Sequence, residues 1–143
     1  MIEMENKIFN SVFERVRNES YAKKLGIELV ELDSGYSKVK MTFKEDMENI
    51  FGMAHGGAIF SLMDEAFETA ANSHGTVSVA LSMSVTYIKP ASAGDVLYAE
   101  AKEVSLSGRI GTYAISVKNA RGDLIAICQA LVYRKKDKLP FLD

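Results

Sequence analysis

A histidine, two glycines and an aspartate lie close together in the stretch NIFGMAHGGAIFSLMDEAFETAANSHG, residues 49–75. Gly56 and Gly57 directly precede a segment with helical periodicity, and the N-terminus of a helix presents unpaired N–H groups and a partial positive charge. Because glycine lets a ligand approach the backbone closely, these N–H groups could bind an oxyanion. Asp64 follows two turns later, where a carboxylate could act as a general base.

Each of these residues also has a purely structural interpretation. A charged residue on a helix is usually a solvated surface group, and glycines can simply form a flexible start to a helix. A lone histidine such as His55 more often forms a structural hydrogen bond than takes part in catalysis. His74, near the end of the same helix, suits the negative end of the helix dipole and is assigned no chemistry.

The helix that carries Asp64 is expected to span residues 57–73 and to end near Gly75. A projection at 100° per residue gives it a broad apolar arc, which predicts that a sheet surrounds most of its circumference. The polar arc consists of Ser61, Asp64, Glu65, Glu68, Thr69 and Asn72. Asp64 falls at the edge of this arc, so we expect partial burial to raise its pKa. The glutamates and the threonine that follow it are expected to face solvent or another subunit.

The other expected elements are an N-terminal helix and a series of strands. Apolar residues at helical spacing predict an amphipathic helix over residues 5–18, followed by a short helical turn that ends near Gly26. Strands are expected in the segments IELVELD, YSKVKMTF, VSVALSMSVTYIKP, DVLYAEAKEVSL, RIGTYAISVKN and DLIAICQALVYRK. Short connections between the last three predict an antiparallel meander. We therefore expect one α+β domain over residues 1–143, with a long antiparallel sheet wrapped around one central helix.

The composition argues against several classes of protein. A chain of 143 residues can bury a core without disulfides, and a net charge of -2 does not indicate a nucleic-acid binder. The single cysteine, Cys128, lies in an apolar run and is expected to be a small buried hydrophobe, in agreement with a reducing cytoplasm. No segment resembles a signal peptide or a membrane span. We expect a cytoplasmic protein that binds neither nucleic acid nor membranes.

The stretch NIFGMAHGGAIFSLMD resembles the signature of hotdog-fold thioesterases of the PaaI, or phenylacetate-degradation, type. Asn49, Gly52 and His55 are followed by Gly-Gly and then by Asp64, nine residues after the histidine, and the match in spacing is complete. The later segment VTYIKPASAGD resembles the strand and turn that follow the helix in this family. The resemblance extends from about residue 22 to residue 134.

This resemblance implies hydrolysis of an acyl-coenzyme A thioester with an aryl or medium-chain acyl group, without a metal or other cofactor. It also implies a homodimer or homotetramer with active sites between subunits, each built from the His-Gly-Gly end of one chain and the acid of another. Asp64 would be the general base or the nucleophile, and the N–H of Gly57 or Gly56 would bind the thioester oxygen. Asn49 and His55 would orient the thioester or water.

Further contacts to the substrate follow from the same resemblance. The candidates for the acyl pocket are Phe51, Met53, Phe60 and Met63, with core packing as the simpler role for at least half of them. Some relatives carry Ser or Thr on the strand after the helix, where this chain has Ala80. Ser82 is expected to share that face of the strand and to take over the role. Candidate cations for the phosphates of coenzyme A, none of them assigned, are Lys89, Arg109, Arg134, Lys135 and Lys136.

Two other functions stay open on the sequence alone. A hotdog hydratase or dehydratase would also act on acyl thioesters, but it usually pairs a histidine with an acid at another spacing. A non-enzymatic protein would bind acyl-coenzyme A and release no thiol. An assay of free thiol with short, long and aromatic acyl-coenzyme A separates the three functions.

Overall fold

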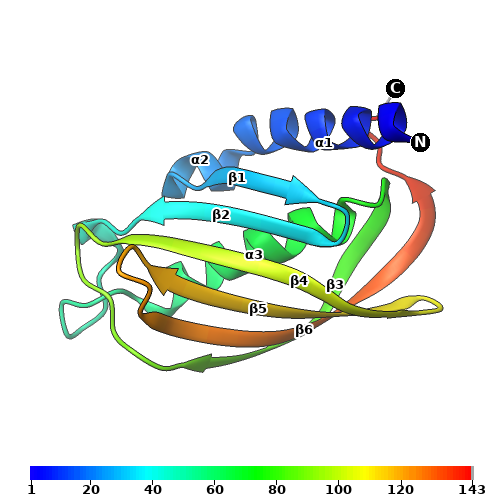
Figure 1. The fold of residues 1–143 in the computed structure, drawn as a ribbon. Coiled ribbons are helices and arrows are strands. Elements are labelled where there is room, and N and C mark those ends of the chain that lie inside the picture. The colour runs from blue at the N-terminus through cyan, green and yellow to red at the C-terminus, as the bar shows by residue number, and fades with distance from the viewer. Residues whose placement is uncertain (143) are drawn as a thin grey trace.

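The central helix, α3 (Gly56–Asn72), lies in the concave face of a curled antiparallel sheet (Figure 1). The computed structural model describes residues 1–142. Leu62, Met63 and Ala66 on α3 are fully buried against the sheet, which explains the broad apolar arc of this helix. This arrangement is the hotdog fold, so the predicted fold class is confirmed.

The sheet has six strands in the order β1-β2-β4-β5-β6-β3. The strands are β1 (Glu28–Asp33), β2 (Tyr36–Thr42), β3 (Thr76–Tyr87), β4 (Val96–Ser107), β5 (Ile110–Asn119) and β6 (Leu124–Lys138). The meander predicted for the last three strands is confirmed, because β4 pairs with β5 and β5 pairs with β6. β1 and β3 form the two edges, and β3 runs directly out of the end of α3.

Alternation along the strands directs one set of side chains toward α3. On β5, Tyr113, Ile115 and Val117 are buried, while the residues between them are exposed or half-buried. The ring of Tyr113 meets that of Phe67 on α3 edge to face, with 5.5 Å between the ring centroids. The hydrophobic core therefore lies between the concave face of the sheet and the central helix.

Two helices precede the sheet and lie beside β1 (Figure 1). α1 (Ile2–Arg17) buries Ile8, Val12 and Val16, and α2 (Ser20–Leu25) ends at Gly26 with φ at +72°, as the glycine stop predicts. α1 begins three residues earlier than expected, and the acidic Glu3 and Glu5 in its first turn suit the positive end of the helix dipole. None of the helices within residues 1–142 has the length and apolar character needed to cross a membrane.

The polar face of α3 is more deeply buried than its sequence predicts. Glu65 is only 5% exposed and Thr69 only 2%, so the expectation that these two face solvent or another subunit is wrong, whereas Glu68 is exposed as expected. The chain that forms α1 and α2 lies against this face of α3. The Tyr21 hydroxyl on α2 forms a 2.8 Å hydrogen bond with the Ser61 hydroxyl on α3. A helix projection shows which residues share a face, but it contains no information about what covers that face.

Candidate active site

The loop before α3 is shaped by the side chain of Asn49. Its Oδ1 accepts hydrogen bonds from the N–H groups of Phe51, at 2.8 Å, and Met53, at 3.1 Å. Gly52, at φ +74°, makes the turn between them. The carbonyl end of Asn49 therefore holds the loop together, and its amide nitrogen forms no hydrogen bond within the described residues. That nitrogen is the part of Asn49 that could reach a ligand.

His55 is the N-cap residue of α3. Its Nδ1 accepts a hydrogen bond of 2.9 Å from the N–H of Gly57, and its own N–H donates to the carbonyl of Met47. Because Nδ1 acts as an acceptor, the proton of the neutral ring is on Nε2. His55 therefore uses Nδ1 for a structural hydrogen bond, while its Nε2–H is a donor on an exposed side chain.

A side chain at Gly56 or Gly57 would meet a close neighbour. A Cβ on Gly56 would lie 3.2 Å from Cζ of Tyr87, and one on Gly57 would lie 3.1 Å from Nδ1 of His55. The Tyr87 hydroxyl also donates to the carbonyl of Gly56, at 3.0 Å. The N–H of Gly56, unlike that of Gly57, forms no hydrogen bond within residues 1–142.

Tyr87 is a site residue that the sequence did not reveal. It lies at the end of β3, 31 residues after Gly56, and supports the first turn of α3 through both its ring and its hydroxyl. The only available signal was its place in the segment VTYIKPASAGD. Periodicity within β3 gives no indication that this ring turns back to the start of the preceding helix.

Asp64 lines a hollow of about 240 Å³ between α3 and the edge strand β3. The other walls are formed by Phe67, Glu68, Ala71, Asn72, Ser78, Val79, Ala80 and Val132. Partial burial raises the pKa of Asp64 above its ordinary value, and the negative charge of Glu19 raises it further. The predicted direction of the pKa change is therefore confirmed. A raised pKa makes this carboxylate a stronger base once it has lost its proton.

The position of Ser82 differs from the expectation. The register between β3 and β6 shifts between Ala80 and Ser82, so that Ala80 lies opposite the buried Val132 while Ser82 lies opposite Leu131. Leu81 is the extra residue of this bulge, and it reverses the inward and outward alternation. Ser82 therefore lies on the other face of the strand from Ala80, and the expectation that it could replace a residue there is wrong.

The predicted acyl-pocket residues separate into two groups. Met63 is fully buried in the core, so core packing accounts for it. Phe51 is 79% exposed at the tip of the loop before α3, and Met53 is half-buried beside it. Phe60 is 37% exposed and lies one helical turn before Asp64, on the same side of α3. Three of the four side chains thus stay available for contact with a ligand.

Two residues that were given no catalytic role have structural ones. Cys128 is buried as predicted, and burial raises the pKa of its thiol. The Nε2 of His74 lies 2.6 Å from Oε1 of Glu103 on β4, which holds the end of α3 against the sheet. His74 lies at the other end of α3 from Gly56, and neither residue lines the hollow beside Asp64.

Comparison with known proteins gives consistent matches over most of the chain. Residues 51–126 match the thioesterase superfamily. A protein of Archaeoglobus fulgidus, described as a candidate esterase, is 42% identical over 87% of this chain and 80% of its own length. The acyl-coenzyme A thioesterase PaaI of Escherichia coli is 33% identical over 92% of this chain and 94% of its own. The solved structure of the E. coli PaaI protein superimposes with a TM-score of 0.89 at 31% identity, over 94% of this chain and 97% of that one.

Proposed function

The chain belongs to the thioesterase superfamily and is a thioester hydrolase, and on this premise we propose that it hydrolyses acyl-coenzyme A thioesters to a free acid and coenzyme A. The name of its E. coli relative supports this substrate class. The exposed apolar side chains of Phe51 and Phe60 favour an aryl or medium-chain acyl group, since both could contact such a group next to the start of α3.

The observation that carries the proposal is the distance between the two halves of the site. Gly56 and Asp64 are eight residues apart on one helix, which separates them by ~12 Å at 1.5 Å per residue. Reacting groups must approach to roughly 3–3.5 Å. A single chain therefore cannot bring its own Asp64 to a carbonyl group held at Gly56, so we place Asp64 of the partner subunit at that position.

The edge strand β3 offers the surface for such a pair. β3 is twelve residues long, has no neighbouring strand on one side, and exposes the apolar side chains of Val79 and Leu81. A long exposed edge strand can pair with the same strand of a second copy. If the two strands pair antiparallel about a two-fold axis, every contact between the copies occurs twice. The hollow that contains Asp64 is walled by this same strand, so a second chain on β3 would cover it.

The mechanism that we propose uses few groups. The N–H of Gly56 binds the thioester oxygen, because that of Gly57 is bound to His55, and one such donor is worth about 2.7–4 kcal/mol in the transition state. Asp64 of the partner subunit removes a proton from water, which attacks the carbonyl carbon, or attacks directly to give a mixed anhydride that water then cleaves. The thiolate of coenzyme A leaves and takes up the proton. Nε2–H of His55 and the amide of Asn49 orient the thioester.

The variant Asp64→Asn tests this assignment, because the amide has the same shape but cannot accept the proton. We expect kcat to fall about 10²–10⁴-fold, measured as free thiol released from benzoyl-, phenylacetyl- and octanoyl-coenzyme A. Asp137→Asn, at the exposed end of β6, is the matched control and should keep full activity. A loss of less than about tenfold in folded Asp64→Asn would reject Asp64 as base or nucleophile.

A further inference from the structure

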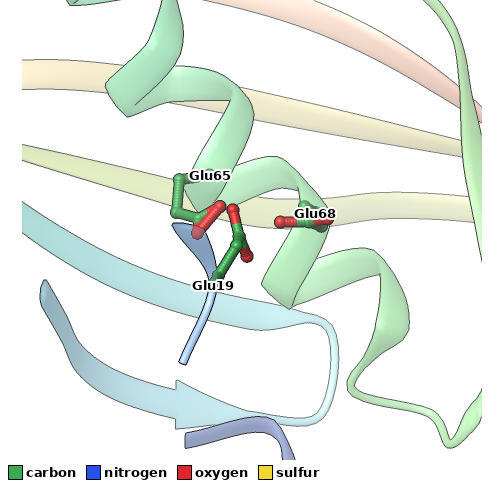
Figure 2. A group of neighbouring side chains, drawn as sticks. All are labelled: Glu19, Glu65 and Glu68. Carbon is green, nitrogen blue, oxygen red and sulfur yellow. The ribbon is translucent and has the colours of Figure 1, made fainter. Parts of the chain in front are cut away.

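Three glutamates converge on the side of α3 that faces the N-terminal helices (Figure 2). Glu65 and Glu68 lie one turn apart on α3, and Glu19 comes from the junction between α1 and α2. One carboxylate oxygen from each lies within 4.8 Å of the others. Like charges at this spacing repel one another, so the arrangement needs a compensating group.

Glu65 has one carboxylate oxygen that no group within residues 1–142 compensates. Its side chain is 95% buried, since only 5% is exposed, and its Oε2 has no hydrogen-bond partner among the described residues. Figure 2 shows this carboxylate directed toward that of Glu19. A buried carboxylate without a partner is destabilising, and native proteins rarely keep one without a ligand, a proton or a counter-ion. Burial raises the pKa of Glu65, and the neighbouring Glu68 and Glu19 raise it further.

Within residues 1–142, no ion pair links a lysine or arginine to the cluster. Arg15 lines the cavity beside them, but its guanidinium lies over the ring of Phe141, 5.9 Å from the centroid. Asp64 adds a further negative charge near Glu68. Glu19 occupies the N-cap position of α2 without forming the usual capping bond to that helix, so its carboxylate is left for α3.

The geometry fits a divalent cation that prefers oxygen ligands. Oxygens on opposite sides of Ca²⁺, each at 2.3–2.6 Å from the ion, lie roughly 5 Å apart, which is compatible with the 4.8 Å limit in the cluster. Glu19 and Glu68 also border a cavity of about 270 Å³ between α1, α3 and the C-terminal segment, which has room for the water ligands that a site with three carboxylates requires.

We propose that Glu19, Glu65 and Glu68 bind one hard divalent cation of the Ca²⁺ and Mn²⁺ class, which ties the α1–α2 junction to the central helix. This site is separate from the start of α3 and does not depend on the proposed function. It departs from our expectation from the sequence that the protein binds no metal. The expectation came from the family resemblance, and Glu19 is 46 residues away from Glu65 in the chain, so no local sequence pattern indicates the cluster.

The test is a titration of the full chain, freed of metal with a chelator and dialysed, with MnCl₂ and separately with CaCl₂. We expect electron paramagnetic resonance to show one bound Mn²⁺ per chain, and the melting temperature to rise with the concentration of either ion. Glu65→Gln should fold at least as stably as the wild type in chelator, because it removes an unpaired buried acid. It should also weaken Mn²⁺ binding by more than ~10-fold. Loss of a group that only supports a metal ligand already lowers metal affinity by at least about this factor, and Glu65 would be a ligand itself.

Two further variants complete the test. Glu19→Gln, at the α1–α2 junction, should weaken binding in the same way, and it replaces Glu65→Gln as the probe if that variant does not fold. Glu5→Gln removes one exposed charge from α1 and should bind Mn²⁺ like the wild type. Failure of the wild type to bind either ion, or equal binding by the cluster variants and Glu5→Gln, would overturn the proposal. Thiol release plays no part in these measurements, so their failure would leave the proposed function untouched.

Discussion

At the start of α3, the imidazole of His55 occupies a position that Ser, Thr, Asp or Asn usually fills. Its Nδ1 accepts the N–H of Gly57, and this bond fixes the ring so that Nε2–H points away from the helix. The same bond leaves the N–H of Gly56 as the donor that has no partner within the described residues. One structural contact therefore decides which backbone donor is available and which ring nitrogen can donate.

His55→Ala removes this cap. We expect the free energy of unfolding to fall by about 0.5–2 kcal/mol, because an N–H in the first turn loses its acceptor. His55→Asn should restore most of the stability, since asparagine is a good N-cap, while thiol release stays lowered because Nε2–H is absent. Urea unfolding and the thiol assay on the same samples measure both effects. Wild-type stability in His55→Ala would show that the cap contributes nothing.

At the residue scale, the sequence predicted which residues lie at the candidate site better than it predicted how deeply each side chain is buried and what it contacts. The raised pKa of Asp64 followed from its place at the edge of the polar arc. The burial of Glu65 did not, because it depends on the N-terminal helices, which are distant in the chain. Tyr87 was missed for the same reason, since its contact with Gly56 joins the end of β3 to the start of α3.

At the scale of elements, β4 is joined to its neighbours by side-chain hydrogen bonds as well as by the backbone hydrogen bonds of the sheet. Oε1 of Glu103 accepts the Tyr113 hydroxyl of β5 at 2.9 Å and lies 2.6 Å from Nε2 of His74 at the end of α3. Tyr36 of β2 donates in the same way to Glu100 at 2.8 Å. Burial raises the pKa of the Tyr113 and Tyr36 phenols, and the acceptor carboxylates raise it further.

Tyr113→Phe should lower the free energy of unfolding by about 1.5–3 kcal/mol, the range for a hydrogen bond to a charged group. The pH dependence follows from the raised pKa of the folded state. The stabilising effect of the phenol is fully present below its ordinary pKa of about 10 and is lost as the pH rises above that value. The melting temperatures of the wild type and Tyr113→Phe should therefore differ by a constant amount from pH 8 to about 10, and above that pH the wild-type melting temperature should fall more steeply. Parallel curves would contradict this role for Tyr113.

Most elements were predictable because their periodicity is local. The central helix was expected at residues 57–73 and spans Gly56–Asn72, and the strands begin and end within a few residues of the segments expected for them. The pairing of β3 with β6 and the bulge at Leu81 were not predictable. One inserted residue leaves the apolar pattern of a strand almost unchanged, yet it turned Ser82 to the opposite face.

At the scale of the whole molecule, the fold holds the two halves of the candidate site too far apart to act within one chain. The rigid α3 keeps Gly56 and Asp64 ~12 Å apart. The long edge of β3, which exposes Val79 and Leu81, offers a surface for pairing with a second copy. We therefore propose that the dimer is the smallest catalytic unit, and that each dimer contains two sites related by symmetry.

Complementation between two inactive variants tests this claim most directly. Asp64→Asn removes the acid, and Gly56→Val puts a branched side chain at the first residue of α3, which should block the approach of the thioester to the N–H of Gly56; its Cβ alone would lie 3.2 Å from Cζ of Tyr87. We expect each variant alone to lose at least ~100-fold in kcat. Chains co-expressed in equal amounts should regain roughly a quarter of wild-type thiol release, since half of the dimers are mixed and each of these keeps one intact site. A mixture no more active than the two separate variants would contradict a site shared between chains.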